Sequence, residues 1–354
     1  MGIARLTTRT RAVLGLLVLG AALLLAAPLG AAKPPAYTVV PLVSSDPTVV
    51  PPGDPDLVNA WGLTSGPATP WWVSDNGTGK STLYNGAGVK QGLVVSVPGG
   101  PTGTVFNTTT GFILPGGSKA LFLFDGEDGI VRAWNQAQGT TAIIVKNRSD
   151  VGAIYKGLAI ATTPDGPRLF AADFHNNRID VFDSNFGLVP NSGFLDPSLR
   201  SGFAPFNVQV IGSRVFVAYA KQDADAEDEL AGQGRGRVDV YDLSGNLLGG
   251  INGHGQLNAP WGLALASASF GTYAGDLLVG NFGDGHINAY REVSPNTFVH
   301  DGELRGEDNK PLAIDGLWAL QFAQGGNNGT AGTLYFTAGP NDESDGLFGR
   351  IQVG

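Results

Sequence analysis

Six residues recur at similar intervals along the chain and could line one shared binding site. The intervals are 45, 50, 50, 55 and 54 residues, and the residues are Trp61, Phe106, Lys156, Phe206, Trp261 and Asp315. Four of the six are aromatic, and asparagines accompany them at Asn59, Asn107, Asn207 and Asn258. Aromatic rings with a few amides, one cation and one carboxylate suit a carbohydrate or another small polar ligand. The alternative is that the aromatic residues only pack between repeats of the fold.

One histidine lies beside an acid in the stretch LFAADFHNNRIDVFD (169–183), a pair that could act in acid–base catalysis. Asp173 occupies the same turn as Asp75 and Asn281 in two similar stretches, and Asp and Asn favour turns because they bond nearby backbone. We therefore interpret His175 as a turn residue. With no cysteine and four widely spaced histidines, the sequence supports neither a thiol nucleophile nor a zinc or copper site.

A repeat of the backbone must position these side chains. Each unit contains an apolar strand near one of the six residues, a second strand, and a third strand after a Gly- or Asn-rich turn. Repeats of about 40–50 residues with three or four strands are typical of β-propellers. We predict a single all-β domain over residues 33–354, a six-bladed β-propeller. The N-terminal strand 37–44 is expected to complete the last blade, which closes the ring and covers an open edge.

Two resemblances accompany the repeat. The stretch 169–183 resembles an NHL repeat. NAPWGLALA (258–266), LLVGNFGDGHINAY (277–290) and LYFTAGPNDESDGLFG (334–349) resemble a family of exported bacterial proteins of uncharacterised function, expected to be six-bladed propellers. This second resemblance covers nearly all of the mature chain. It implies the NHL-like fold and export, but no substrate and no catalytic residue.

Three functions fit a propeller of this kind. The favoured one is a binding module whose channel face contacts its ligand through Trp61, Lys156, Phe206, Asn207, Asn258, Trp261 and Asp315. An alternative is a lactonase or ester hydrolase, because the fold resembles that of gluconolactonase-type propellers, which hold Ca²⁺ in the channel. The expected Ca²⁺ ligands here are Asn207, Asp315 and Asp173. The early channel glutamate of those enzymes has no counterpart, since the first glutamate is Glu127. A purely structural extracellular module is the third alternative.

An acidic insertion interrupts the fourth unit at residues 221–237. Its acids follow in close succession, at Asp223, Asp225, Glu227, Asp228 and Glu229. Alternating oxygen ligands are typical of calcium loops, yet the turn glycine and the terminal bidentate glutamate of an EF-hand are missing. We interpret the insertion as a solvated loop beside the channel mouth, with a lid or a weak calcium site as alternatives.

The N-terminal segment predicts export. Three arginines precede an apolar run at 12–27 and the small-residue segment PLGAAK (28–33), as in a secretory signal peptide spanning residues 1–32. An uncleaved membrane anchor is the alternative. With a formal net charge of −9, the chain is a poor candidate for binding nucleic acid or an anionic membrane surface, and we expect neither as a partner. We expect a secreted or periplasmic monomer that binds a small polar ligand, a glycan or a protein.

Overall fold

Short apolar runs separated by tight turns form the strands of this protein. The computed structural model describes residues 1–2, 36–251 and 255–354. The predicted signal peptide falls almost entirely outside these residues. The strands of the first half are β1 (Tyr37–Ser44), β2 (Ala60–Thr64), β3 (Trp71–Asp75), β4 (Lys80–Tyr84), β5 (Lys90–Ser96), β6 (Pro101–Phe106), β7 (Phe122–Gly126), β8 (Ile130–Trp134), β9 (Ile143–Asn147), β10 (Tyr155–Thr163), β11 (Gly166–Asp173) and β12 (Arg178–Asp183).

The second half continues in the same way. Its strands are β13 (Phe203–Ile211), β14 (Arg214–Lys221), β15 (Gly236–Asp242), β16 (Leu247–Ile251), β17 (Pro260–Leu265), β18 (Leu277–Asn281), β19 (Ile287–Ser294), β20 (Thr297–Glu303), β21 (Leu317–Phe322), β22 (Leu334–Ala338) and β23 (Leu347–Val353). The helical segments are single 3₁₀ turns, η1 (Asn76–Thr78), η2 (Gln136–Gln138), η3 (Ser149–Val151), η4 (Gly271–Tyr273) and η5 (Gly326–Asn328). Within the described ranges, no helix is long and apolar enough to cross a membrane.

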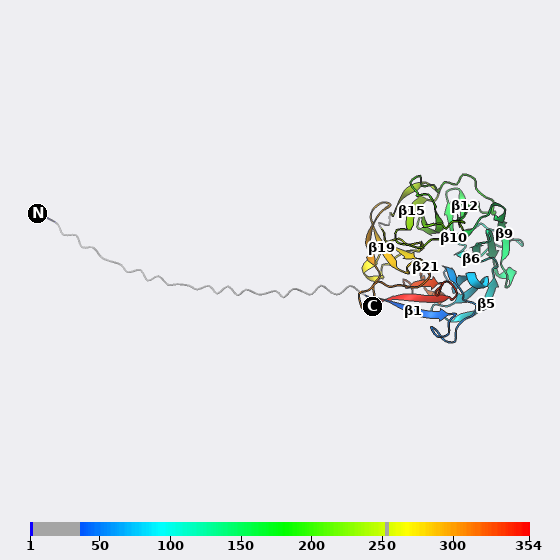
Figure 1. Cartoon of the computed structure of the whole chain (residues 1–354), viewed down its shortest axis with the longest axis horizontal. Helices are drawn as coiled ribbons and strands as arrows, with labels where there is room; N and C mark the ends of the chain where they lie inside the picture. The colour runs from blue at the N-terminus through cyan, green and yellow to red at the C-terminus, as the bar shows by residue number, and fades with distance from the viewer. Residues whose placement is uncertain (3–35, 252–254) are drawn as a thin grey trace. The chain divides into compact units, whose positions relative to one another are not determined.

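Antiparallel meanders follow one another around a ring (Figure 1). Three sheets have the strand orders β2-β3-β4-β5, β6-β7-β8-β9 and β10-β11-β12, and a fourth has the order β1-β23-β22-β21. The fifth sheet has eight strands, and consists of the meanders β13–β16 and β17–β20 joined through one parallel pair, Gly250 with Thr297. The prediction of an all-β, propeller-like fold is therefore confirmed.

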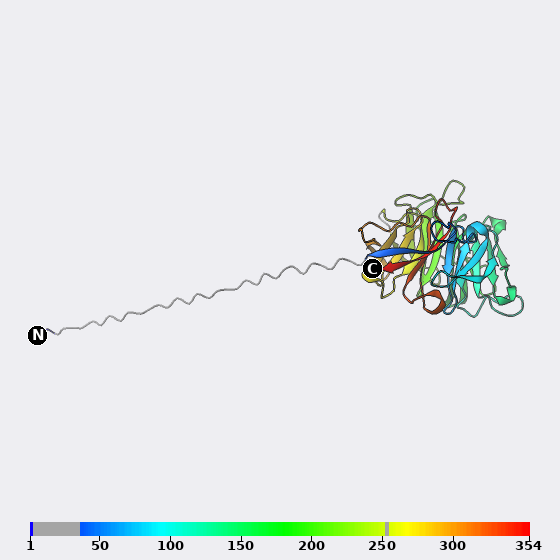
Figure 2. The same ribbon diagram turned by 90° about the horizontal axis from the view of Figure 1, so that it is seen from below.

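The N-terminal strand completes the last sheet, as predicted. β1 pairs antiparallel with β23, from Tyr37 opposite Val353 to Ser44 opposite Leu347. The two strands, β1 in blue and β23 in red, lie side by side in both views (Figure 1 and Figure 2). Tyr37 also donates a hydrogen bond of 3.1 Å to the carbonyl of Phe270, between β17 and β18. The strand thus ties two neighbouring parts of the ring together.

The first strands of successive meanders pack against one another in a closed series. β2 contacts β6, and the series continues through β10, β13, β17 and β21 back to β2. The approach is close because glycine occupies crowded positions: a Cβ on Gly62 would lie 2.4 Å from the Thr102 carbonyl oxygen, and one on Gly103 would lie 2.3 Å from the Leu158 nitrogen. We call the space that these six strands surround the channel.

Candidate functional site

One end of the channel is filled by aromatic side chains. The plug, as we call it, consists of Trp61, Phe206, Trp261 and Trp318, which come from four different first strands. Trp61 stacks on Trp318 with ring centroids 3.5 Å apart, and Trp261 meets both rings edge-on at 6.2 and 6.0 Å. All four side chains are at most 5% exposed. Three predicted ligand-binding residues therefore pack on one another and leave little of their rings open to a ligand.

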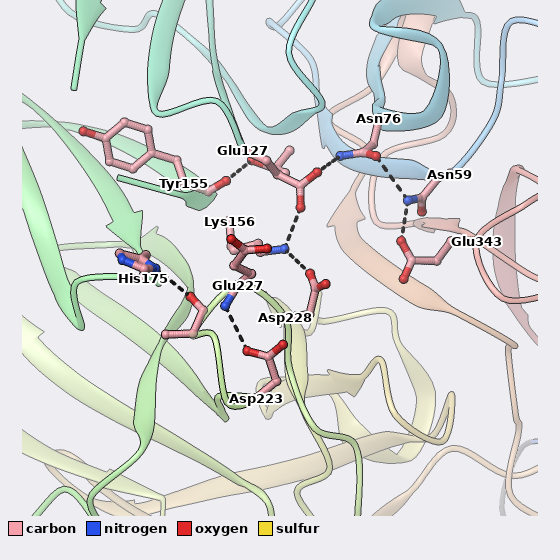
Figure 3. Close-up of polar contacts among 12 residues, drawn as sticks. Asn59, Asn76, Glu127, Tyr155, Lys156, His175, Asp223, Glu227, Asp228 and Glu343 are labelled. Carbon is pink, nitrogen blue, oxygen red and sulfur yellow. Dashed lines mark hydrogen bonds and ion pairs between the residues drawn. The ribbon is translucent and has the colours of Figure 1, made fainter. Parts of the chain in front are cut away.

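Lys156 lies against this plug and is buried to 1% exposure. Its Nζ is 5.3 Å from the centre of the Trp61 ring, 2.6 Å from Glu127 Oε1 and 2.9 Å from Asp228 Oδ1 (Figure 3). Burial alone would lower the pKa of the lysine, but the two carboxylates raise it above its usual value. Lys156 is therefore a permanently charged group whose nitrogen is already occupied by two partners.

A chain of hydrogen bonds extends from Lys156 across this mouth of the channel. Glu127 accepts from the Asn76 amide at 2.9 Å, and Asn59 donates to both Asn76 and Glu343 (Figure 3). Burial raises the pKa of Glu343. Burial also raises the pKa of Glu229, to about 8, although the positive charge of Lys156 opposes the shift. The mouth thus holds several carboxyl groups around one cation.

The acidic insertion folds over the same mouth. We call residues 222–235, between β14 and β15, the long loop. Asp228 extends from it to Lys156, Gln222 Nε2 donates to the Phe174 carbonyl at 2.7 Å, and His175 Nδ1 lies 3.2 Å from the Ala226 carbonyl oxygen. The position beside the channel mouth, and the turn role of His175, are confirmed.

The three predicted calcium ligands have separate partners. Asp173 is buried at the end of β11, pairs with Arg178 at 3.0 Å and accepts from Asn176. Asn207 donates to the Trp261 carbonyl at 2.7 Å. Asp315 is exposed and accepts from a backbone N–H in the next loop. Within the described residues, no group of three or more His, Cys, Asp or Glu is placed to hold a metal ion. Calcium binding stays a prediction.

The other predicted residues occupy different surroundings. Asn258 donates to Asp284 at 3.1 Å and accepts from the Gly232 N–H, so it fastens the long loop to its neighbour. The position beside Trp61 in the last repeat belongs to Trp318, because Asp315 precedes β21 and faces solvent. Phe106 is the last residue of β6, so it does not occupy the position near the start of a first strand that Trp61 occupies in β2.

The opposite end of the channel contains a cavity of about 290 Å³, which we call the channel cavity. It is lined by the second halves of the first strands, including Thr64, Phe106 and the amides Gln209, Gln321 and Gln324. The amides of Gln209 and Gln321 make no hydrogen bond with the described part of the chain. A narrower cavity that these two glutamines also line continues inward to Trp261 of the plug.

Neither glutamine was predicted from the sequence as a binding residue. Gln209 and Gln321 each follow a plug residue by three positions, Phe206 and Trp318, within largely apolar strands. Because side chains alternate along a strand and apolar neighbours pack in the core, a polar residue there marks a position that faces a different environment. The signal that could have identified them is the glutamine that interrupts each apolar run, in FNVQV and in LWALQF.

Comparison with known proteins identifies relatives and structural neighbours. No family model matches the sequence. The uncharacterised protein R648 of Acanthamoeba polyphaga mimivirus is 31% identical over 319 residues, which cover 84% of this chain and 76% of R648. The uncharacterised protein L690 of the same virus is 31% identical over 327 residues, covering 84% of this chain and 81% of L690. Both relatives are viral, so the expected restriction to exported bacterial proteins is not supported.

Solved structures share the fold at low identity. A glucose dehydrogenase superposes with a TM-score of 0.56 and 12% identity, covering 90% of this chain and 99% of the enzyme. A streptogramin B lyase superposes with a TM-score of 0.51 and 10% identity, covering 90% and 98%. At such identities the comparison shows a β-propeller fold alone. The different activities of the two neighbours leave the function to be argued from this chain's own residues.

Proposed function

The chain belongs to the family that includes the mimivirus proteins R648 and L690, and we propose that it binds a small neutral polar ligand in the channel cavity. The observation that carries the proposal is the pair of unbonded amides, Gln209 and Gln321, on the cavity wall. A side-chain amide offers two donors and an acceptor, and leaving such groups unpaired in a partly buried place costs free energy. Ligand hydroxyl groups would supply the missing partners.

The remaining lining defines the kind of ligand. Phe106 and Val105 provide an apolar surface beside the amides, and Thr64 adds a hydroxyl group. Among the described residues that line the cavity there is no charged side chain. A volume of about 290 Å³ lies at the small end of the usual range for ligand pockets. Uncharged, amide-rich and partly apolar, the cavity suits a monosaccharide, a polyol or the terminal sugar of a glycan.

The proposal also includes the domain organisation and the location of the protein. We propose a single six-bladed propeller domain over residues 33–354, because six first strands follow one another around the channel and one residue pair joins the two meanders of the eight-stranded sheet. The described residues 36–251 and 255–354 also form one compact unit. The arginines and apolar run of residues 1–32 support export to the periplasm or the medium, where glycans and free sugars are available.

A thermal-shift screen tests the binding proposal. The protein is melted with monosaccharides, disaccharides and polyols, since a ligand at a hundred times its Kd stabilises the folded state by about 2.7 kcal/mol. We expect at least one compound to raise the Tm of the wild type, and Gln209→Leu or Gln321→Leu to abolish that shift. Gln352→Leu, on the exposed part of β23, is the matched control and should keep it.

Two outcomes would overturn this function. One is a panel in which every neutral compound leaves the Tm unchanged. The other is a bound compound whose Tm shift survives both substitutions in the channel cavity, because that ligand would occupy another part of the molecule. A shift produced only by a folded protein partner would mean that the propeller binds a protein, the other expected class of partner.

A further inference from the structure

A second and larger cavity lies outside the channel. Its volume is about 520 Å³, and it is lined by the loop 85–87, the glycine-rich loop 325–330, Tyr335 on β22 and Arg350 on β23. The two loops belong to different sheets, since 85–87 joins β4 to β5 and 325–330 lies between β21 and β22. We call this space the rim cavity. It shares no lining residue with the channel cavity.

Hydrogen bonds hold the rim cavity in shape. The Gly86 N–H donates to the Asn327 carbonyl at 2.9 Å, and the Tyr335 hydroxyl donates to the Gly86 carbonyl at 2.7 Å. Trp71 Nε1 donates to the Asn328 carbonyl at 2.7 Å, which anchors the glycine-rich loop to β3. A cavity bounded by fixed loops loses little conformational entropy when a ligand binds.

Arg350 gives the rim cavity its chemical character. Its guanidinium carries a permanent positive charge, and it forms no ion pair with an acid among the described residues. The Nε atom is buried and has no hydrogen-bond partner there either. The arginine borders Tyr335, whose pKa is raised by burial and lowered in part by the guanidinium. Other partly buried cations, such as Lys119 and Arg168, also lack an acidic partner. Arg350 differs because, among the described residues, it combines a buried guanidinium nitrogen without a hydrogen-bond partner with the lack of any ion pair, and such a group requires an explanation.

The other groups of the rim cavity also favour an anion. Among the described residues, Arg350 is the one charged side chain that lines it. Asn85 Oδ1 accepts from the N–H groups of Ala87 and Val89, which orients its amide so that the NH₂ group remains available as a donor. Thr330 and Asn327 add a hydroxyl group and a second amide.

We propose that the rim cavity binds a small organic carboxylate, with Arg350 as the counter-ion. One guanidinium matches the single charge and the two oxygens of a carboxylate, whereas a phosphate dianion would keep excess negative charge there. The surrounding amides and hydroxyl fit a ligand that carries hydroxyl groups, such as a hydroxy acid or a sugar acid. The site differs from the channel cavity in charge as well as in position, so either can fail without the other.

Titration calorimetry with the purified protein tests this site. The probes are lactate, gluconate and glucuronate, with inorganic phosphate and sulfate as competing anions. We expect a carboxylate to bind the wild type and Arg350→Gln to weaken it roughly tenfold to a hundredfold, the range for a charged hydrogen bond. Asn327→Asp places a negative charge in the same cavity at nearly constant volume and should weaken binding similarly. Arg291→Gln, at an exposed arginine of β19, should leave the affinity unchanged.

Each alternative result has a clear meaning. Tighter binding of phosphate or sulfate than of every carboxylate would overturn the ligand class. Carboxylate binding that neither substitution weakens would overturn the location. Failure of all three carboxylates to bind at about 10 mM, roughly ten times a millimolar Kd, would overturn the site itself. Since Asn327 is exposed and only its backbone carbonyl bonds within the loops, Asn327→Asp keeps the test valid if Arg350→Gln fails to fold.

Discussion

Tyr37→Ala tests whether the N-terminal strand closes the ring. Tyr37 is 3% exposed, its ring lies 5.1 Å from that of Phe270 and 6.0 Å from that of Tyr273, and its hydroxyl donates to the Phe270 carbonyl. Removing a large buried aromatic side chain costs about 3–5 kcal/mol. The lost hydrogen bond accounts for about 1 kcal/mol of this total. Since domains are typically stable by about 5–15 kcal/mol, the substitution should remove a large share of the stability.

Urea denaturation measures the effect as a fall in the free energy of unfolding. Tyr37→Phe should lose only the hydrogen-bond contribution of about 1 kcal/mol. Thr38→Ala, at the next residue of β1 but exposed, should change stability by less than about 0.5 kcal/mol. If Tyr37→Ala costs no more stability than Thr38→Ala, the N-terminal strand does not contribute to closing the ring.

Four further predictions concern the channel. Lys156→Met should lower the free energy of unfolding by about 2 kcal/mol, which is less than the cost of breaking a fully buried ion pair, because the carboxylate partners are partly exposed. The same substitution should speed proteolysis of the long loop 222–235. An unchanged cleavage rate would contradict the role of Lys156 as the anchor of this loop. Burial raises the pKa of Glu229 from 4.5 to about 8, so the folded state holds a proton that the unfolded state loses, and this group's contribution to stability falls as pH rises from about 4.5 to 8. Glu229→Gln should therefore raise the Tm relative to the wild type above pH 8, and a constant difference between pH 5 and 9 would refute the assignment. Gly103→Ala should cost at least about 2 kcal/mol because its Cβ would meet backbone nitrogen of β10, while Gly92→Ala, which has open space, should cost little. Adding Ca²⁺ after chelation tests the expected ligands Asn207, Asp315 and Asp173: binding should raise the Tm and would support the hydrolase alternative, whereas an unchanged Tm would contradict it.

The repeat made much of the fold predictable. Alternating apolar runs between turns identified the antiparallel strands, and a surplus strand at residues 37–44 indicated how the last sheet is completed. The alignment of the repeats was less accurate. It matched residues by aromatic character and chose Phe106, whereas the close backbone approaches at Gly62 and Gly103 make Thr102, which precedes Gly103, the counterpart of Trp61. A threonine with no aromatic ring offers no such signal in sequence.

The candidate site was harder to predict for a related reason. The residues that most suggested a binding site, such as Trp61 and Lys156, lie at the end of the channel that the plug fills, where the aromatic rings pack on one another. Gln209 and Gln321 were not predicted as binding residues, because strand periodicity does not indicate whether a polar residue faces solvent or a cavity. Arg350 likewise has no distinctive sequence pattern, since what singles it out is a buried guanidinium nitrogen that has no partner among the described residues.

The two ends of the channel differ because a buried cation requires counter-charges. Lys156 rests against the plug, and burying its charge without partners would be prohibitively costly. Glu127 supplies one partner from the β7–β8 turn, and Asp228 supplies the other, which requires the long loop to fold over the mouth. The insertion, the lysine and the plug are therefore mutually dependent, and together they fill this end. The proposed ligand would therefore enter from the opposite end, where uncharged amides such as Gln321 offer donors and acceptors to hydroxyl groups.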